Sequence, residues 1–163
     1  MKHLWAPWRM TYIREGIDDS ECLFCSLLDS EDGPDNLILY RGQHAFAILN
    51  RFPYTNGHTM VVPYDHKSSL EGLSPPVLLE MITFTQQSLQ VLREVYQTDG
   101  FNIGANIGEA AGAGVKEHVH LHIVPRWHGD TNFMATTAET RVLPEALEVT
   151  YQRLRQLWKA STA

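Results

Sequence analysis

The fold is most constrained by one alternating segment, which spans residues 118–126 and reads HVHLHIVPR. Successive side chains of a β-strand point to opposite faces of the sheet. A strand here therefore places His118, His120 and His122 in a row on one face and directs the intervening apolar residues toward a core. At a rise of roughly 3.3 Å per residue, neighbouring imidazoles lie about 7 Å apart. Such a chain needs a sheet with one packed face and one face that carries the histidines.

Hydrophobic patterning elsewhere predicts one sheet crossed by a long helix. Short apolar runs bounded by turn residues predict strands, and apolar residues at three- and four-residue spacing predict helices. The expected strands lie at about 37–41, 45–50 and 101–107, and a further strand between the second and the last of these ends at Pro63. The expected helices lie at 75–97 and 144–160. Strands, a crossing helix and then further strands are the order of an α+β domain.

Length and charge narrow the class of protein. The 163 residues predict a single domain at roughly 150 residues per domain. We place its core at about 22–133, with 1–21 and the helix at 144–160 as extensions. The formal net charge is -6 and no basic stripe is present, so nucleic-acid binding is not expected. Neither a signal peptide nor an apolar run near the roughly 18 residues of a membrane span is visible, which predicts a cytoplasmic protein without a membrane partner.

Two chemistries use a row of imidazoles. His-x-His on a strand can hold zinc with an open position that activates water. A neutral imidazole can instead attack phosphorus and form a covalent intermediate, because an unperturbed pKa near 6.5 leaves the free base available at pH 7. The loop EAAGAGVKE precedes the row, and its glycines let backbone N–H groups approach phosphate oxygens, which favours the second chemistry. Further positive charge is expected from a protonated His122, Lys116 or Arg126.

The two cysteines form one motif, Cys22-x-x-Cys25. Two cysteines cannot make the disulfide framework of a secreted domain, and a zinc ribbon needs a second pair of ligands. A redox motif of this type would precede a helix in a βαβ unit, which is not visible nearby. Spacing alone therefore leaves a metal site, a redox pair and two reduced thiols as alternatives.

The run from His118 to Arg126 resembles the signature of the histidine-triad nucleotide-binding family, and so does the upstream segment FAILNRFPYTNGHTMVVP. The resemblance covers roughly residues 22–133. The flanking pieces WAPWRMTYI and PRWHGDTNFM resemble the bacterial branch that includes diadenosine tetraphosphate phosphorylases. The resemblance implies an antiparallel sheet with one long crossing helix and a C-terminal helix, and a homodimer in which two half-sheets join.

The resemblance also implies roles for single residues. His120 is the implied nucleophile toward the α-phosphate, His122 hydrogen-bonds the phosphate or the bridging oxygen, and His118 orients the row. Asn50 matches the ribose-binding position of the family. The other residues expected to contact nucleotide are Phe46, Ile48, His58, Asn106, Gly112, Ala113, Gly114, Val115 and Trp127. The loop lacks the glutamine of the commoner family pattern, so its backbone amides from Gly112 to Val115 take that place.

In zinc-bearing members of the family, a CxxC pair is joined by a histidine after the third strand and by the first triad histidine. The matching residues are Cys22, Cys25, His66 and His118. Four such ligands make a closed tetrahedral site, so the implied zinc is structural. It would also fix the ring of His118 next to the nucleophile. No organic cofactor is expected.

The expected function is nucleotidyl transfer on dinucleoside polyphosphates through a covalent nucleotidyl-histidine. The first expectation is phosphorolysis of diadenosine tetraphosphate to ADP and ATP, with inorganic phosphate as acceptor. Hydrolysis of dinucleoside polyphosphates or nucleoside phosphoramidates by the same family mechanism is an alternative. Two alternatives belong to other classes: a zinc-dependent hydrolase with His118 and His120 as ligands, and a module that binds nucleotides without turnover.

Overall fold

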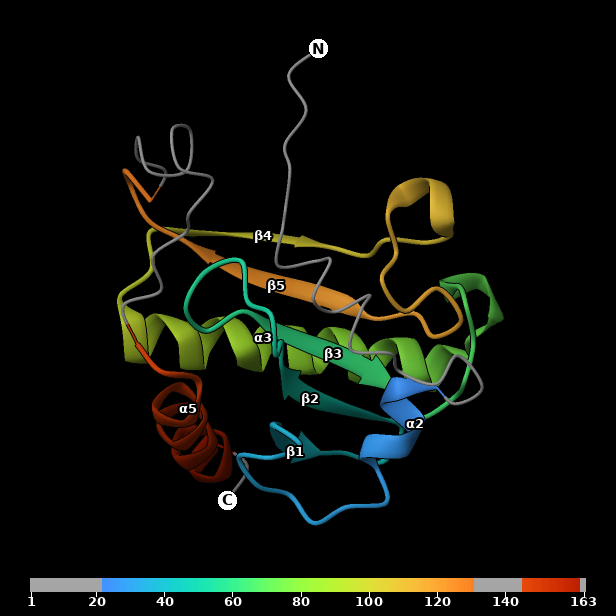
Figure 1. Ribbon diagram of the computed structural model, residues 1–163, viewed down its shortest axis with the longest axis horizontal. Coiled ribbons are helices and arrows are strands. Elements are labelled where there is room, and N and C mark those ends of the chain that lie inside the picture. Colours follow the sequence, from blue (N-terminus) through green and yellow to red (C-terminus); the bar gives the residue numbers. More distant parts are fainter. Residues whose placement is uncertain (1–21, 131–144, 162–163) are drawn as a thin grey trace.

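The computed structural model describes residues 22–130 and 145–161 of the chain. Five strands form one antiparallel sheet in the order β1-β2-β3-β5-β4 (Figure 1). The strands are β1 (Ile38–Arg41), β2 (Ala45–Leu49), β3 (Thr59–Pro63), β4 (Gly100–Gly104) and β5 (Leu121–Arg126). The alternating segment 118–126 thus ends in an inner strand, between β3 and β4.

Helices cover one face of this sheet. The long helix α3 (Pro75–Tyr96) contacts β2, β3 and β5, and α5 (Leu147–Ser161) packs beside it against β1 (Figure 1). A short helix, α2 (Leu23–Leu27), precedes the sheet, and two 3₁₀ turns, η1 (Leu70–Gly72) and η2 (Glu109–Ala111), lie in the connections. No helix among the described residues combines the length and the apolar character that a membrane crossing needs.

The core lies between the sheet and these two helices. Val77, Met81 and Phe84 are buried on the inner side of α3. Trp158 of α5 is 1% exposed, stacks on Tyr40 at 5.7 Å between ring centroids and meets Phe84 edge-on. Full burial of one large apolar side chain contributes about 1.5–3 kcal/mol. This packing leaves the opposite face of the sheet available for a site.

The structure confirms three of the expected elements, and each of their ends lies within one residue of its expected position. These elements are the strands at 37–41 and 45–50 and the helix at 75–97. The strand expected at 101–107 ends at Gly104, and the strand expected from 118 begins only at Leu121. The late start follows from a long-range contact: the Val119 N–H donates to the carbonyl oxygen of Lys67 (2.7 Å), outside the ladder between β3 and β5. His118 and His120 therefore lie on the approach to the strand.

Candidate functional site

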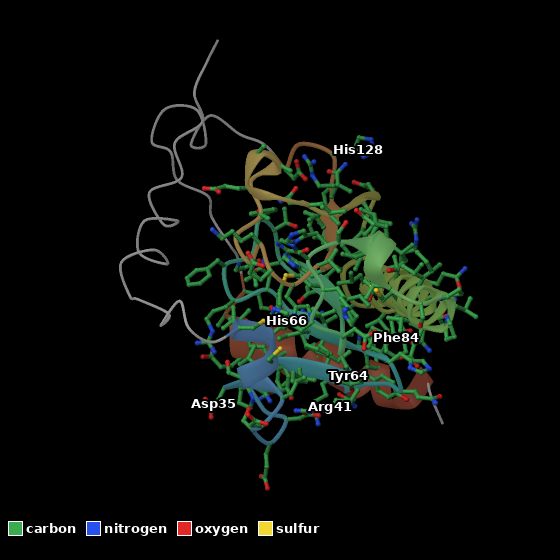
Figure 2. All side chains as sticks on the ribbon, turned by 90° about the vertical axis from the view of Figure 1, so that its right-hand side faces the viewer. Asp35, Arg41, Tyr64, His66, Phe84 and His128 are labelled. Carbon is green, nitrogen blue, oxygen red and sulfur yellow. The ribbon has the colours of Figure 1, made fainter. Side chains whose placement is uncertain are left out.

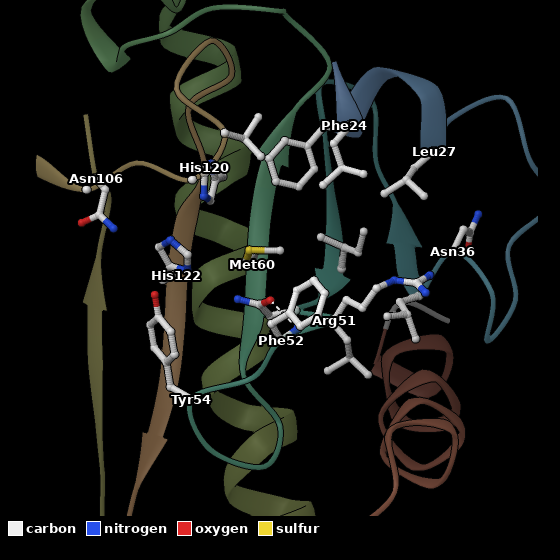
Figure 3. A pocket seen from close by; sticks show the side chains of 18 residues that line it. Phe24, Leu27, Asn36, Arg51, Phe52, Tyr54, Met60, Asn106, His120 and His122 are labelled. Carbon is white, nitrogen blue, oxygen red and sulfur yellow. Dashed lines mark hydrogen bonds between the residues drawn. The ribbon is translucent and has the colours of Figure 1, made fainter. Parts of the chain in front are cut away.

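A cavity of about 360 Å³ opens on the sheet face opposite α3 (Figure 3). One wall is apolar and includes Leu27, Leu37 and Ile48. The other side carries His120 and His122, and Figure 3 shows Asn106 beside them. The cavity therefore joins a surface suited to a flat apolar group with a surface rich in nitrogen donors and acceptors.

Most of the residues expected to bind nucleotide line this cavity. They are Ile48, Asn50, Asn106, Gly112, Gly114, Val115, His120 and His122. Phe46 instead is fully buried and stacks on Tyr64 at 5.6 Å, and Ala113 is not part of the lining. The Trp127 indole N–H donates to the carbonyl oxygen of Tyr96 (3.2 Å), which holds this ring against the end of α3.

Other residues that line the cavity were not named as candidates from the sequence. They include Phe24 and Leu23 of α2, Asn36, and Arg51, Phe52 and Tyr54 after β2. Two signals were available: the CxxC motif contains Leu23 and Phe24, and the segment FAILNRFPYTNGHTMVVP contains Arg51, Phe52 and Tyr54. Because the CxxC motif was interpreted as a metal site, a redox pair or two reduced thiols, its neighbours were not considered as cavity walls.

His120 has its tautomer set by the backbone. Its Nδ1 lies 2.9 Å from the carbonyl oxygen of His118, and a carbonyl oxygen can only accept, so Nδ1 carries the hydrogen. The neutral ring then has an unprotonated Nε2. His120 lines the cavity and is 5% exposed, so this site holds an imidazole with one nitrogen available as a nucleophile.

His122 receives the opposite tautomer through His58. The Asn50 side-chain oxygen accepts the Phe52 N–H (2.9 Å), which directs the Asn50 amide nitrogen toward His58 Nδ1 (3.4 Å). The Tyr54 N–H donates to the same Nδ1 (3.1 Å). His58 therefore carries its hydrogen on Nε2 and donates it to His122 Nδ1 (3.0 Å), which leaves the hydrogen of His122 on Nε2. His122 is thus a hydrogen-bond donor beside a nucleophilic ring.

The surroundings of all three triad histidines favour the neutral ring. Burial lowers the pKa of His118 and His120, and burial together with the adjacent His120 lowers the pKa of His122 to about 4. The expectation of a protonated His122 is therefore wrong for the free protein. Arg126 forms an ion pair with Asp130 and donates to Asn102, outside the cavity lining.

The glycine-rich loop borders the cavity next to the histidines. Gly108 and Gly112 have φ values of 80° and 81°, a backbone conformation that residues with a Cβ rarely adopt. Lys116 in the same loop is exposed. The Gly112 N–H donates to the carbonyl oxygen of Glu109 (2.9 Å) and the Ala113 N–H to that of Gly108 (3.4 Å). Of the four amides expected to bind phosphate, those of Gly114 and Val115, which both line the cavity, are therefore the donors that this loop offers.

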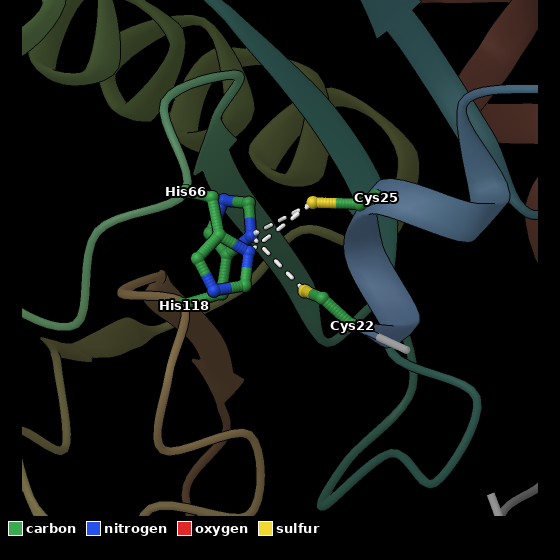
Figure 4. A group of neighbouring side chains, drawn as sticks. All are labelled: Cys22, Cys25, His66 and His118. Carbon is green, nitrogen blue, oxygen red and sulfur yellow. Dashed lines mark hydrogen bonds between the residues drawn. The ribbon is translucent and has the colours of Figure 1, made fainter. Parts of the chain in front are cut away.

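A second cluster lies on the other side of His118 and contains Cys22, Cys25 and His66 (Figure 4). Figure 2 shows His66 beside α2 in the side view. All four donor atoms lie within 4.8 Å of one another. Cys22 Sγ is 3.2 Å from His118 Nδ1, and Cys25 Sγ is 3.3 Å from His66 Nδ1. Among the described residues this is the one group of three or more His, Cys, Asp or Glu side chains that could share an ion.

The donor set fits zinc. Tetrahedral zinc with Zn–S of about 2.3 Å and Zn–N of about 2.05 Å places sulfur and nitrogen ligands about 3.5 Å apart. His118 Nε2 donates to the carbonyl oxygen of Pro63 (2.8 Å), so its Nδ1 presents a lone pair to the cysteines. Burial and the neighbouring Cys22 raise the pKa of Cys25 to about 11, the direction expected where no cation faces the thiols. The four residues implied as metal ligands are thus brought together.

Comparison with known proteins agrees with this geometry. The HIT domain family model matches residues 33–129. The chain is 36% identical to the AP-4-A phosphorylase of Mycobacterium tuberculosis, over 97% of this chain and 85% of that protein. An uncharacterized HIT-like protein of Saccharolobus solfataricus is 34% identical over 69% of this chain and 79% of its own length.

Solved structures with a similar fold are also histidine triad proteins. A Zn-bound histidine triad family protein from Mycobacterium smegmatis superimposes with a TM-score of 0.69 at 30% identity, covering 88% of this chain and 97% of that protein. A histidine triad nucleotide-binding protein from Sulfolobus tokodaii superimposes with a TM-score of 0.68 at 26% identity, covering 85% and 93%. The chain belongs to the histidine triad (HIT) family and is an enzyme of its nucleotidyltransferase and hydrolase group.

Proposed function

We propose that the protein is a diadenosine tetraphosphate phosphorylase, which uses inorganic phosphate to cleave its substrate into ADP and ATP. The observation that carries this proposal is the tautomer of His120, whose Nδ1–H is held by the His118 carbonyl so that Nε2 is the nucleophilic nitrogen. The choice of substrate and acceptor is supported by the 36% identity to an AP-4-A phosphorylase over nearly the whole chain.

In the first step, His120 Nε2 attacks the α-phosphorus of one adenylyl half. An N–P bond forms, the bond between phosphorus and the bridging oxygen breaks, and ATP leaves with both electrons of that bond. The imidazolium that results keeps its Nδ1–H on the His118 carbonyl oxygen, 2.9 Å away in the free protein. Placing this acceptor opposite the reacting nitrogen stabilises the positive charge that develops on the ring.

His122 acts on the leaving group. Its Nε2–H is the donor suited to the bridging oxygen, on which negative charge develops as the bond breaks. Proton transfer is not required, because the oxygen that leaves becomes part of a terminal phosphate of ATP. His58 acts through His122 as a positioning residue, since it fixes which nitrogen of His122 carries the hydrogen.

In the second step, an oxygen of inorganic phosphate attacks the same phosphorus. The new P–O bond forms, the N–P bond breaks, and ADP leaves with His120 restored to its neutral form. The amides of Gly114 and Val115 border this end of the cavity, and we assign the phosphate oxygens to them. Leu27, Leu37 and Ile48 form the apolar surface on which we place the base, and we place the ribose at Asn50, which also lines the cavity.

A structural zinc belongs to the same proposal. Cys22, Cys25, His66 and His118 would hold the ion, which would join α2 to the start of the catalytic segment. A metallohydrolase with His118 and His120 on one ion is not supported. His118 Nδ1 faces the cysteines, whereas His120 Nδ1 is a hydrogen-bond donor to the backbone.

We also propose a homodimer formed at the open edge of the sheet. β4 is an edge strand, and Ile103 and Ile107 at this edge are 50% and 41% exposed. Exposed edge strands with apolar side chains pair readily with another strand. Light scattering during size exclusion should give twice the chain mass, and Ile103→Lys should shift it to the monomer; a wild-type monomer at micromolar concentration would contradict the dimer.

Product analysis tests the activity. Diadenosine tetraphosphate is incubated with the wild type or His120→Ala, with and without inorganic phosphate, and the nucleotides are separated by chromatography. The expected result is that ADP and ATP form over many turnovers only with phosphate and only with His120 present, and that at most one ATP per enzyme forms without phosphate. AMP and ATP in equal amounts without phosphate would make the enzyme a hydrolase, and full activity in His120→Ala would reject the covalent mechanism.

A further inference from the structure

Helix α2 contributes to both the metal cluster and the cavity. Cys22 is the N-cap residue of α2 and Cys25 is its central residue, and their sulfur atoms point to His66 and His118 (Figure 4). Phe24 and Leu27 of the same helix line the cavity, as Figure 3 shows. One short element thus supplies half of the metal ligands and part of the wall expected to contact nucleotide.

This helix has little stability of its own. It contains five residues, and its N-cap residue makes no side-chain capping hydrogen bond. Helices shorter than about 12–15 residues are marginal in water without tertiary contacts. The position of α2 therefore depends on the two groups of contacts it makes: the thiols with the histidines, and Phe24, which is 2% exposed, with the inner wall of the cavity.

His118 provides a second connection between the two sites. Its imidazole is 3.2 Å from the Cys22 sulfur, and its carbonyl oxygen accepts the hydrogen bond that sets the tautomer of His120. The Phe24 ring packs edge-on against the His118 ring at 5.4 Å and lies 5.0 Å from the His120 ring. Phe24 and His118 are therefore shared between the metal ligands and the nucleophile.

We propose that metal binding by the Cys22–Cys25–His66–His118 cluster and nucleotide binding in the cavity are energetically coupled through α2, with Phe24 as a positioning residue for His120. The coupling rests on the proposed nucleotide site and regulates it. Its physical basis is that either ligand orders the same helix and the same histidine segment. The second ligand then binds to groups that are already ordered, so it binds more tightly. Such coupling is reciprocal: nucleotide must raise the metal affinity by the same factor.

Calorimetry with AMP as the probe measures the coupling directly. AMP carries one nucleoside and one phosphate and cannot be turned over. Zinc-loaded protein, freed of excess metal, should bind AMP about 10–100-fold more tightly than chelator-stripped protein, the range found when groups that orient a site are lost. Equal dissociation constants in protein that carries one zinc per chain and in stripped protein would overturn the coupling. Failure of the loaded protein to retain zinc would also overturn it.

The effect of AMP on zinc binding can be measured with zinc-loaded protein alone. The measurement therefore remains possible even if the protein unfolds when its zinc is removed. Zinc transfer to a chromogenic chelator is followed with and without saturating AMP. At equilibrium, AMP should raise the apparent zinc affinity of the protein by the same factor of about 10–100. A transfer rate and endpoint that AMP leaves unchanged would contradict the proposal.

Phe24→Leu and Ser26→Ala separate coupling from stability. Ser26 lies on the same helix with an exposed side chain, so Ser26→Ala should keep the full coupling factor. Phe24→Leu should retain one zinc per chain but lose most of the factor, because Leu lacks the ring that contacts both histidines. If Phe24→Leu weakens AMP binding equally in both metal states, Phe24 is merely structural and its positioning role is rejected.

The outcomes also distinguish this proposal from the proposed activity. AMP binding in neither metal state would reject the nucleotide site and the coupling together. AMP binding that is equal in both states, with diadenosine tetraphosphate still cleaved, would reject the coupling and leave the proposed activity standing.

Discussion

His118 and His120 are two residues apart in one alternating segment, yet they present different nitrogens to different sites. His118 donates from Nε2 to Pro63 and faces the cysteines with Nδ1, whereas His120 donates from Nδ1 to His118 and faces the cavity with Nε2. Both assignments follow from a backbone carbonyl oxygen, which can only accept a hydrogen bond. The difference shows that identical side chains obtain distinct chemistry from the backbone groups around them.

Among the variants considered in this section, we expect the largest loss of activity from a substitution at His58, which sets the tautomer of His122 in the cavity. His58→Phe removes the donor to His122 Nδ1 and frees the His122 ring to take the other tautomer. We expect kcat to fall about 10²–10³-fold, as when one stabilising donor is lost from an active site. His58→Gln keeps an N–H donor of similar reach and should lose at most about tenfold in the same steady-state assay. Equal losses in both variants would contradict the tautomer relay.

Substitution in the cysteine–histidine cluster should lower the stability of the protein. Cys22→Ser removes one thiolate, so we expect the protein to lose its zinc. The loss in unfolding free energy is about 3 kcal/mol at free zinc near 100 times its dissociation constant. Denaturant unfolding with elemental analysis of the same samples measures this, and Ser26→Ala is the matched control on α2. Unchanged stability in a Cys22→Ser protein that is free of metal would exclude a structural ion.

The acid dependence of stability sharpens the comparison further. Burial lowers the pKa of His122 to about 4, below its ordinary value, so the unfolded chain binds the extra proton first as pH falls. This contribution to stability is complete above pH 7 and decreases as pH falls from about 6.5 toward 4. Between pH 7 and pH 5, we expect the unfolding free energy of His122→Asn to decrease by about 2 kcal/mol less than that of the wild type. Parallel pH profiles from denaturant unfolding would contradict it.

The smallest effect is expected at Arg126, which lies at the end of the same strand. Its guanidinium is committed to Asp130 and Asn102, outside the cavity. Arg126→Ala should change kcat/KM for diadenosine tetraphosphate less than about threefold and unfolding free energy by less than about 1 kcal/mol, as for other exposed ion pairs. A loss of kcat/KM above tenfold would show that Arg126 supplies charge to the reaction.

Periodicity and motif spacing predicted the α+β class, the long helix and most strand positions, because these depend on apolar patterns that the sequence displays. The same alternation could not reveal where the ladder begins, since Val119 bonds to Lys67 by a contact across the chain. Helix α2 was not predicted, because five residues are too few for a periodic signal and its position depends on tertiary contacts.

In the candidate site too, some features could be predicted from sequence motifs and others depend on tertiary contacts. The four residues predicted to hold a metal were named from motifs, and the structure brings them together. His120 and His122 were named in the same way, and they lie side by side in the cavity. Phe46 and Ile48 share a face by alternation, but the cavity opens only near the end of β2, so Ile48 lines it and Phe46 does not. The tautomers depend on the Pro63 and His118 carbonyl oxygens, whose positions no side-chain pattern encodes.

The most direct test of the central claim is to look for the nucleotide on His120. Enzyme is mixed with excess diadenosine tetraphosphate without inorganic phosphate and quenched in alkali, which preserves N–P bonds. The adduct is then located by peptide mass spectrometry. The account predicts one adenylyl group on His120, formed with an equal amount of ATP and released as ADP when phosphate is added. Product formation without any adduct, or an adduct on a different residue, would contradict it.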